Sequence, residues 1–454
     1  MNVLLIITNI NGEHEVSYSF GLSSIAGYIE KKGHNCKIMS VTDKKGYHNL
    51  IDEIRRFQPE VIGFTSVSSQ FVYVKELAEL IKGYKKEIIV VCGGVHPTLY
   101  PDALLESNYV DGFFVGESEV AFGEFLEKLE QKAGYFDVPN YAYRKNNKVI
   151  IKELHALIRN LDELPYPKKG HLFKEAIDKT RLAPFLFSRG CPFACSYCSN
   201  HSLARIYGLK HNNPRYRSVE SAINEIKNAL KEYNFQIVYI YDDIFGLNKK
   251  WAISFCEKFK REINKKFLCQ LRVNVVDESF IRALKDAGCY RIQFGVESGN
   301  EYIRNTVMNR NLSNEQIKNA FLLCRKYKIE TNSLNIIGVP GETEEMIWDT
   351  IKLNREIKPT SSGISIFYPY QGTKLGDYCF DNGLVDHDAY GSFSNERRES
   401  VLNYPDEYKE KLTYYYKNWT KLVYPSDIKK SVKTYISKYP TIYGVLKKIK
   451  RSIT

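Results

Sequence analysis

Long apolar segments are missing from this sequence of 454 residues. A helix that crosses a bilayer needs about 20 consecutive apolar residues, and no run in the sequence approaches that length. The first apolar run, Val3 to Ile7, has neither the basic flank nor the small-residue cleavage site of a signal peptide. The sequence therefore predicts a cytoplasmic protein whose first apolar run is a buried strand.

Paired cysteine motifs are also scarce. Ten cysteines in a large chain without a secretory signal do not indicate a disulfide framework. Seven of them lie singly among apolar neighbours, as small core residues do. The other three, Cys191, Cys195 and Cys198, fall within eight residues, but no second CxxC or HxxxH pair accompanies them. The usual four-ligand set of a structural zinc site is therefore incomplete, and zinc is kept only as an alternative.

Positive charge is concentrated at one end of the chain. Residues 421–454 hold nine Lys or Arg against one acidic residue, Asp427, within a net charge of +12. The remainder is nearly balanced, so we expect no nucleic-acid partner. The basic segment Leu446 to Arg451 predicts weak association with anionic lipid or attraction of a phosphorylated substrate, and the alternative is a solvated helix end.

The apolar pattern of residues 1–133 predicts a doubly wound α/β domain. Short apolar runs alternate with helix-period segments, of which the clearest has apolar residues from Leu22 to Ile29 and ends before Gly33. Such a series predicts a parallel sheet covered by helices on both faces, with ligands at the carboxyl ends of the strands. The strands are expected at Val3–Ile7, Cys36–Met39, Val61–Phe64, Ile88–Cys92 and Gly112–Val115. Residues 134–180 are rich in turn residues and are predicted to be a linker.

Residues 181–390 predict a second α/β unit. Six strands are expected, at Phe185–Phe187, Ile237–Ile240, Cys269–Val273, Arg291–Gly295, Ser333–Gly338 and Gly363–Phe367. Six such units predict a partial (β/α)6 barrel whose site lies at the carboxyl ends of its strands. Residues 391–454 are predicted to form a basic, mostly helical C-terminal region.

The three clustered cysteines directly follow the first predicted barrel strand. Their CxxxCxxC spacing, with an aromatic residue before the third cysteine, resembles the signature of the radical S-adenosylmethionine (SAM) superfamily. The resemblance implies a [4Fe–4S] cluster held by Cys191, Cys195 and Cys198, with one iron open to SAM. Reductive cleavage of SAM would give a 5′-deoxyadenosyl radical that removes an unactivated hydrogen atom. It also implies an external electron donor such as flavodoxin or ferredoxin.

The same resemblance assigns contacts with SAM to residues at the ends of the barrel strands. They are Tyr197, Asp242, Asp243, Arg272, Glu297 and Gly338. Each assignment has a structural alternative. Asp242 or Asp243 could cap the following helix, Glu297 could be an ion-pair partner, and Gly338 could serve turn geometry alone.

The N-terminal unit resembles the cobalamin-binding domain found in a large radical SAM subgroup. The similar segments are Gly63–Ser69, Val91–Thr98 and Asp111–Glu119, and the implied cobalamin contacts are Ser66, Ser68, Gly93, Gly94, Val95, Gly116 and Glu117. Paired glycines let the backbone approach a bulky ligand. The cobalt-ligating Asp-x-His-x-x-Gly motif of classical domains is absent from Val41 to His48. Either cobalamin binds without a protein imidazole, or the fold is kept without the cofactor.

Three functions follow from these features. The leading hypothesis is cobalamin-dependent radical methylation of an unactivated carbon in a small-molecule or lipid-type substrate. The second is radical SAM chemistry without methylation, such as cyclisation, dehydration, deoxygenation or epimerisation, with a structural N-terminal domain. The third is a cobalamin or redox sensor, which has no need of a cluster with an open iron.

Overall fold

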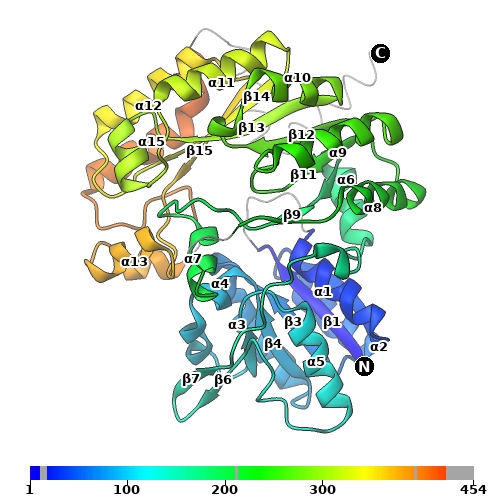
Figure 1. The fold of residues 1–454 in the computed structure, drawn as a ribbon. Coiled ribbons are helices and arrows are strands. Elements are labelled where there is room, and N and C mark those ends of the chain that lie inside the picture. Colours follow the sequence, from blue (N-terminus) through cyan, green and yellow to red (C-terminus); the bar gives the residue numbers. More distant parts are fainter. Residues whose placement is uncertain (11–17, 210–212, 393–395, 426–454) are drawn as a thin grey trace, which may run out of the picture.

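Two α/β units lie one above the other in the computed structural model, which describes residues 1–10, 18–209, 213–392 and 396–425 (Figure 1). The N-terminal unit occupies the lower half of the view and the barrel the upper half. No helix in the described ranges is both long enough and apolar enough to span a membrane. The basic segment at Leu446 to Arg451 lies outside the described residues.

The N-terminal unit is built on a seven-stranded sheet in the order β2-β1-β3-β4-β5-β6-β7. The first five strands run parallel, and β6 and β7 add to the edge in antiparallel orientation. The strand bounds are β1 Asn2–Thr8, β2 Asn35–Val41, β3 Val61–Thr65, β4 Ile89–Gly93, β5 Gly112–Phe114, β6 Tyr141–Lys145 and β7 Lys148–Ile151. All five parallel strands were predicted from the sequence.

Helices cover both faces of this sheet, as the doubly wound prediction requires. Apolar residues of α1 and α5 pack on one face, and those of α2 and α3 pack on the other. The helix α1 begins after Ser19, whose hydroxyl accepts a hydrogen bond from Leu22 N, and it ends before Gly33 at a φ of 92°. The bounds are α1 Phe20–Lys31, α2 Gly46–Phe57, α3 Phe71–Tyr84, α4 Val95–Leu99 and α5 Glu119–Glu130.

The segment 134–180, predicted to be a linker, contains a β-hairpin and a helix separated by irregular chain. The hairpin β6–β7 turns at Asn146 and Asn147, both with positive φ, and it extends the N-terminal sheet. The helix α6, His171–Thr180, packs against the first barrel strand. Turn residues led to the prediction of a linker here, whereas a left-handed asparagine pair of this kind closes a two-residue hairpin.

The second unit is a partial barrel of six parallel strands in the order β8-β11-β12-β13-β14-β15, as predicted. The strands are β8 Leu182–Phe185, β11 Ile237–Ile240, β12 Lys266–Leu271, β13 Cys289–Glu297, β14 Glu330–Ile337 and β15 Ser361–Ile366. The first strand ends at Phe185, where the sequence analysis expected it to begin. A two-stranded ribbon, β9 Ser188–Arg189 with β10 Arg215–Tyr216, follows it.

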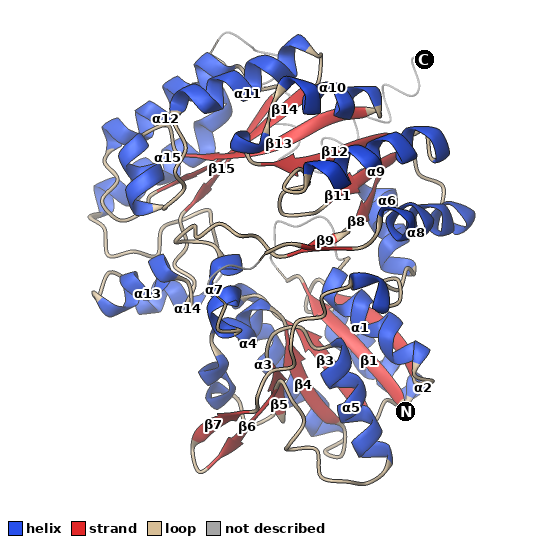
Figure 2. Cartoon of the chain, viewed as in Figure 1, coloured by secondary structure: helices blue, strands red, loops and turns tan. Residues whose placement is uncertain are grey.

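Helices cover the outer face of the barrel strands (Figure 2). The apolar core between them includes Phe185, Ile240, Phe255 and Phe294. Near the C-terminal end, α15 packs against the edge strand β15. The helices are α7 Ser199–Ile206, α8 Val219–Glu232, α9 Lys249–Glu262, α10 Glu278–Asp286, α11 Asn314–Lys326, α12 Glu344–Ile357, α13 Lys374–Asp381, α14 His387–Ser392 and α15 Asp406–Val423.

Candidate functional site

A cavity of about 500 Å³ lies between the two units, at the carboxyl ends of the parallel strands of the N-terminal sheet. Its volume is within the range of small-molecule and cofactor sites. The N-terminal unit contributes mainly apolar and glycine residues, among them Leu5, Gly63, Val91, Phe114 and Phe122. The second unit contributes polar residues: Ser188 and Arg189 of β9, Asn200 of α7, and Tyr241 and Asp243 after β11.

The three cysteines lie on the loop between β9 and α7, next to this cavity. Cys195 is buried, whereas Cys191 and Cys198 are partly exposed. Burial raises the pKa of the Cys191 thiol to about 11, helped by the Asp243 carboxylate, and that of Cys198 to about 12. Free thiolates are therefore disfavoured here, but iron ligation deprotonates a thiol outright. The donor set thus fits a group that brings its own positive charge, as an iron–sulfur cluster does.

The cysteine loop does not provide a site for one metal ion. Within the described residues, no group of three or more His, Cys, Asp or Glu side chains has the arrangement needed to hold a single ion. A cubane cluster differs from zinc because each of its thiolate ligands binds a different iron atom.

Arg310, which the sequence analysis missed, connects the cysteine loop to the end of β13. Its Nη1 donates to the Tyr197 hydroxyl at 2.6 Å and to Glu297 Oε1 at 3.2 Å, and its Nη2 donates to Gly295 O at 2.8 Å. The same Nη1 lies 4.0 Å from Cys195 Sγ. Burial opposes the charge of Arg310, but Tyr197 and Glu297 outweigh it and raise the pKa of the guanidinium.

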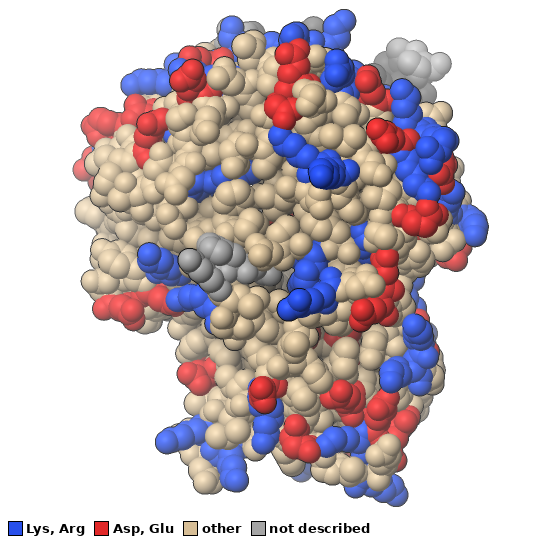
Figure 3. Space-filling view, viewed as in Figure 1, with Lys and Arg blue, Asp and Glu red and all other residues tan. Residues whose placement is uncertain are grey.

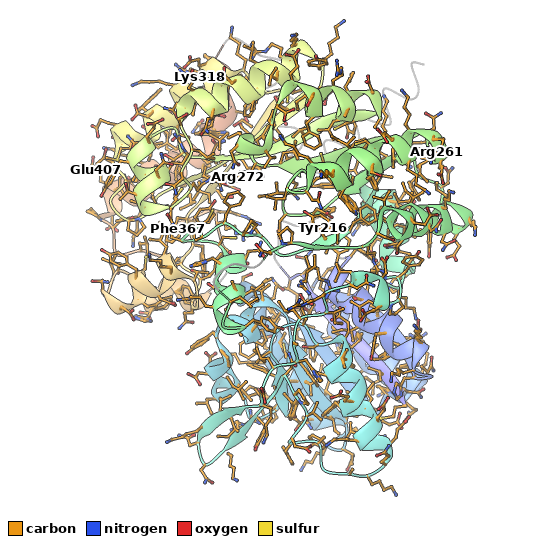
Figure 4. All side chains as sticks on the ribbon, viewed as in Figure 1. Tyr216, Arg261, Arg272, Lys318, Phe367 and Glu407 are labelled. Atoms are coloured by element: carbon orange, nitrogen blue, oxygen red, sulfur yellow. The ribbon has the colours of Figure 1, made fainter. Side chains whose placement is uncertain are left out.

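Arg272 lies beside this network at the end of β12. Its Nη2 donates to the Arg310 carbonyl, and its guanidinium stacks on the Phe193 ring with 3.8 Å between the guanidinium carbon and the ring centroid. Burial and the charge of Arg310 lower the pKa of Arg272 to about 10. Figure 4 shows Arg272, Phe367 and Tyr216 toward the centre of the molecule, while Arg261, Lys318 and Glu407 lie at its periphery. Arg272 thus lies against the cysteine loop, and its contact with SAM stays a prediction.

Glu297 and Gly338 occupy the ends of two adjacent strands, and both have unusual backbones. Glu297 has a φ of 64° at a register shift between β13 and β14. Such strain in a residue other than glycine is concentrated at functional sites. Gly338 has a φ of 76°, and its N–H donates to Glu342 Oε2 at 2.6 Å. Turn geometry alone therefore accounts for a glycine at position 338.

The two neighbouring aspartates have different environments. Asp242 is fully buried and accepts hydrogen bonds from Phe187 N at 2.7 Å and from Ser188 Oγ at 2.6 Å. Its pKa is raised to about 7 because burial disfavours the carboxylate. Asp243 instead faces the cavity, and burial raises its pKa as well. The structure thus gives Asp242 a role in holding the β8–β9 connection and leaves Asp243 accessible to a ligand.

Five of the seven predicted cobalamin residues line the cavity and two do not. The five are Gly93, Gly94, Val95, Gly116 and Glu117. Ser66 and Ser68 are buried, and their hydroxyls bond to Val67 O and to His96 Nδ1. A Cβ on Gly93 would make ordinary van der Waals contact with Phe114, whose carbonyl oxygen would lie 3.6 Å away. These glycine-lined walls fit a bulky planar ligand, whereas the two serine hydroxyls are already engaged.

Glu117 also belongs to an ion-pair cluster between the two units, which we call the interdomain cluster: Glu117, Glu119, Arg189 and Arg215. Arg189, two residues before Cys191, donates to Glu119 Oε1 at 2.6 Å and to Glu117 Oε2 at 3.1 Å. Arg215 also pairs with Glu117. The strand β9 that precedes the cysteine loop is therefore tied to the N-terminal unit. On the visible outer face, by contrast, charges of both signs are interspersed around a largely uncharged centre (Figure 3).

A second tie to the N-terminal unit lies on the other side of the cysteine loop. Tyr207, directly after α7, accepts a hydrogen bond from Glu117 N at 2.7 Å. A Cβ on Gly116 would lie 2.2 Å from the Tyr207 hydroxyl oxygen, and the φ of Gly116 is 78°. Glycine at position 116 is therefore required by the contact between the units as well as by its backbone conformation.

Comparison with known proteins gives two family matches. Residues 185–353 match the radical SAM superfamily, and residues 6–126 match the B12 binding domain. A protein of Pyrococcus horikoshii named as an uncharacterized methyltransferase is 30% identical over 370 residues, covering 80% of this chain and 79% of the relative. The anaerobic magnesium-protoporphyrin IX monomethyl ester cyclase of Rubrivivax gelatinosus is 26% identical, covering 77% of this chain and 64% of the relative.

The solved structure of TsrM from Kitasatospora setae has the same fold. It is a radical SAM methyltransferase with its tryptophan substrate and a SAM analogue bound, and it aligns with a TM-score of 0.68 at 17% identity. The alignment covers 84% of this chain and 76% of TsrM. These matches confirm the predicted order of a cobalamin-binding type domain before a radical SAM barrel.

Proposed function

This chain belongs to the radical SAM superfamily and carries a B12 binding domain, and from that premise we propose that it is a cobalamin-dependent radical methyltransferase. The proposed acceptor is an unactivated carbon of a small-molecule or lipid-type substrate. The relative from Pyrococcus horikoshii, which is named as a methyltransferase and shares most of its length with this chain, supports this choice.

The shared cavity is the observation that carries the proposal. Its walls come both from the glycine loops of the N-terminal unit and from the segment Ser188–Gly190, which leads directly into Cys191. A methyl donor held by the first unit and a radical generated at the second would thus face the same space. Reactants held together in this way need no diffusion between separate sites.

Side chains of this chain can hold, orient and protect the reactants. When bound, the cluster supplies the electron that cleaves SAM, and the corrinoid supplies the methyl group for the substrate carbon. Asp243 offers a carboxylate to a ligand at the barrel end of the cavity. Phe20, Leu22 and Leu203 give this cavity apolar walls, which exclude water and so protect a reactive radical. We expect a one-electron donor such as flavodoxin or ferredoxin to act from outside.

The proposed binding of cobalamin in this cavity is tested by filling the cavity with a larger side chain. Val95 is 40% exposed and lines the cavity, so Val95→Trp places a large ring inside it without disturbing a packed core. Leu80, 36% exposed on α3 and absent from the cavity lining, provides the control Leu80→Trp. After anaerobic expression with cobalamin, we expect the Val95 variant to lose most of its extractable corrinoid and the control to keep it. Wild-type protein without any corrinoid would refute the proposal.

A second candidate is radical SAM chemistry without methyl transfer, supported by the relative in Rubrivivax gelatinosus that is named as a cyclase. The two functions are separated by turnover with SAM labelled in its methyl group, using reconstituted protein and product analysis. Methylation predicts label in the product, whereas cyclisation, dehydration, deoxygenation or epimerisation predicts 5′-deoxyadenosine without labelled product. Failure of the protein to cleave SAM at all would instead favour the sensor.

A further inference from the structure

Arg310 is held in place more extensively than its neighbours in the sequence. Arg310 is 7% exposed, and its guanidinium contacts Tyr197, Glu297 and Gly295 O at 2.6 to 3.2 Å. It also approaches Cys195 Sγ to 4.0 Å, which is within reach of a weak N–H···S hydrogen bond. The contact places a fixed positive charge at one of the three cysteines of the loop.

The charge is not needed to hold the cysteine loop mechanically. Residues just before Arg310 already do so: Asn309 Nδ2 donates to Ala194 O at 2.8 Å, and Ser196 bonds to Val307 O at 2.6 Å and to Met308 O at 3.1 Å. Burying a guanidinium carries a large loss of hydration that its partners must offset. A neutral side chain would have avoided this cost, so the charge calls for a further explanation.

Near Cys195, positive charge exceeds negative charge, because two arginines lie there with one carboxylate. Arg310 pairs with Glu297 at 3.2 Å, but Arg272 forms no ion pair within the described part of the chain. Asp243, near Cys191 and Cys198, is the other carboxylate close to the thiols. Net charge and hydrogen bonds to sulfur are among the factors that set the reduction potential of an iron–sulfur cluster.

We propose that Arg310 is a positioning residue that raises the reduction potential of the cluster by directing its charge and an N–H group at Cys195. The cluster gains one electron from an external one-electron reductant and passes from the 2+ to the 1+ state. The added negative charge is stabilised by a cation that is already in place, so little reorganisation is needed. This inference rests on the proposed function, because it requires the three cysteines to hold the cluster.

The test is an anaerobic redox titration of the reconstituted full chain without SAM, with the reduced cluster measured by electron paramagnetic resonance. We expect Arg310→Gln to lower the ratio of reduced to oxidised cluster about tenfold at a fixed potential, equivalent to a shift of about 59 mV for one electron. Arg310→Lys keeps the charge but not the forked geometry, so we expect a smaller shift in the same direction.

Glu297→Gln provides a shift of opposite sign. Removing this carboxylate leaves the charge of Arg310 less compensated, so the reduced fraction should rise rather than fall. If the pair of Arg310 and Glu297 had only a structural role, the reduction potential would shift in the same direction in both variants or in neither. This variant also keeps the inference testable if Arg310→Gln does not fold.

Arg304 offers a matched control. It is a fully buried arginine six residues before Arg310, but its guanidinium bonds to Leu312 O, Ser298 O and Asn314, away from the cysteines. Arg304→Lys should leave the potential unchanged. Unchanged potentials in both Arg310 variants and in Glu297→Gln would overturn the inference. Absence of a [4Fe–4S] signal in the wild type would instead contradict the proposed function.

Discussion

Removing one charge from the interdomain cluster should destabilise the protein markedly. Glu119 is 4% exposed, and it accepts hydrogen bonds from Arg189 Nη2 and from Ser24 Oγ, both at 2.6 Å. Breaking a buried ion pair by removing one partner costs about 3–5 kcal/mol. Arg189 keeps Glu117 as a second partner. We therefore expect Glu119→Gln to cost about 3 kcal/mol, at the lower end of that range.

The pH dependence of this loss follows from the pKa of Glu119. Burial raises that pKa, but Arg189 and the hydrogen bonds lower it by more, so the folded-state pKa lies below the ordinary value of a glutamate carboxyl. A carboxyl group with a depressed folded-state pKa stabilises the protein above its unfolded pKa, and this contribution disappears as the pH falls through the folded-state pKa. The difference between wild type and Glu119→Gln should therefore be largest at neutral pH and should shrink in acid.

Urea denaturation of the full chain at pH 7 and at pH 4 measures both effects. Glu127→Gln is the control on the same helix, because Glu127 pairs with Lys32 at 3.2 Å while both side chains are nearly half exposed. Exposed pairs contribute about 0–1 kcal/mol. Equal losses in the two variants, or a loss in Glu119→Gln that grows in acid, would refute the reasoning.

Three further substitutions have specific expected outcomes. Ionisation of the buried Asp242 carboxyl opposes folding, because its folded-state pKa is near 7. The wild type should therefore lose stability as the pH rises from about 4 to 7, and Asp242→Asn should lose less over this range, as measured by thermal melts. Gly116→Ala should cost more than about 2 kcal/mol, since positive φ alone costs an L-residue about 1–2 kcal/mol and the new Cβ would collide with Tyr207. Tyr207→Phe should cost only about 1 kcal/mol, the contribution of one hydrogen bond to Glu117 N. Urea denaturation distinguishes the last two, and equal losses would argue against the collision.

The regular elements were predictable because their signals are local. Apolar runs such as Val61–Phe64 and Ile237–Ile240 coincide with β3 and β11 to within a residue, since burial on both faces of a parallel strand requires a continuous apolar run. The cysteines were found because three metal-ligating residues lie within eight positions. The hairpin β6–β7 was missed because its strands are short and polar at one end, with lysines at 145 and 148.

The partners of the site residues were not predictable from local pattern. Arg310 lies 115 positions from Cys195, and Arg189 lies 70 positions from Glu119. Neither arginine differs in sequence from any surface arginine, because what distinguishes them is burial against a carboxylate on another element. Asp242 and Asp243 are adjacent in sequence, yet one is sealed against Ser188 and the other faces the cavity. Which of two neighbours turns outward depends on the strand that packs beside them.

The two ties that flank the cysteine loop affect how the domains can be separated. Arg189 precedes the loop and Tyr207 follows it, and both end on the segment Glu117–Glu119 and its neighbour Gly116. Removing the N-terminal unit would thus remove both ties at once. The N-terminal unit therefore does more than bind a ligand of its own, because it also helps to position the three cysteines of the loop. A barrel expressed alone would be expected to assemble its cluster poorly even though it contains every cysteine of the motif.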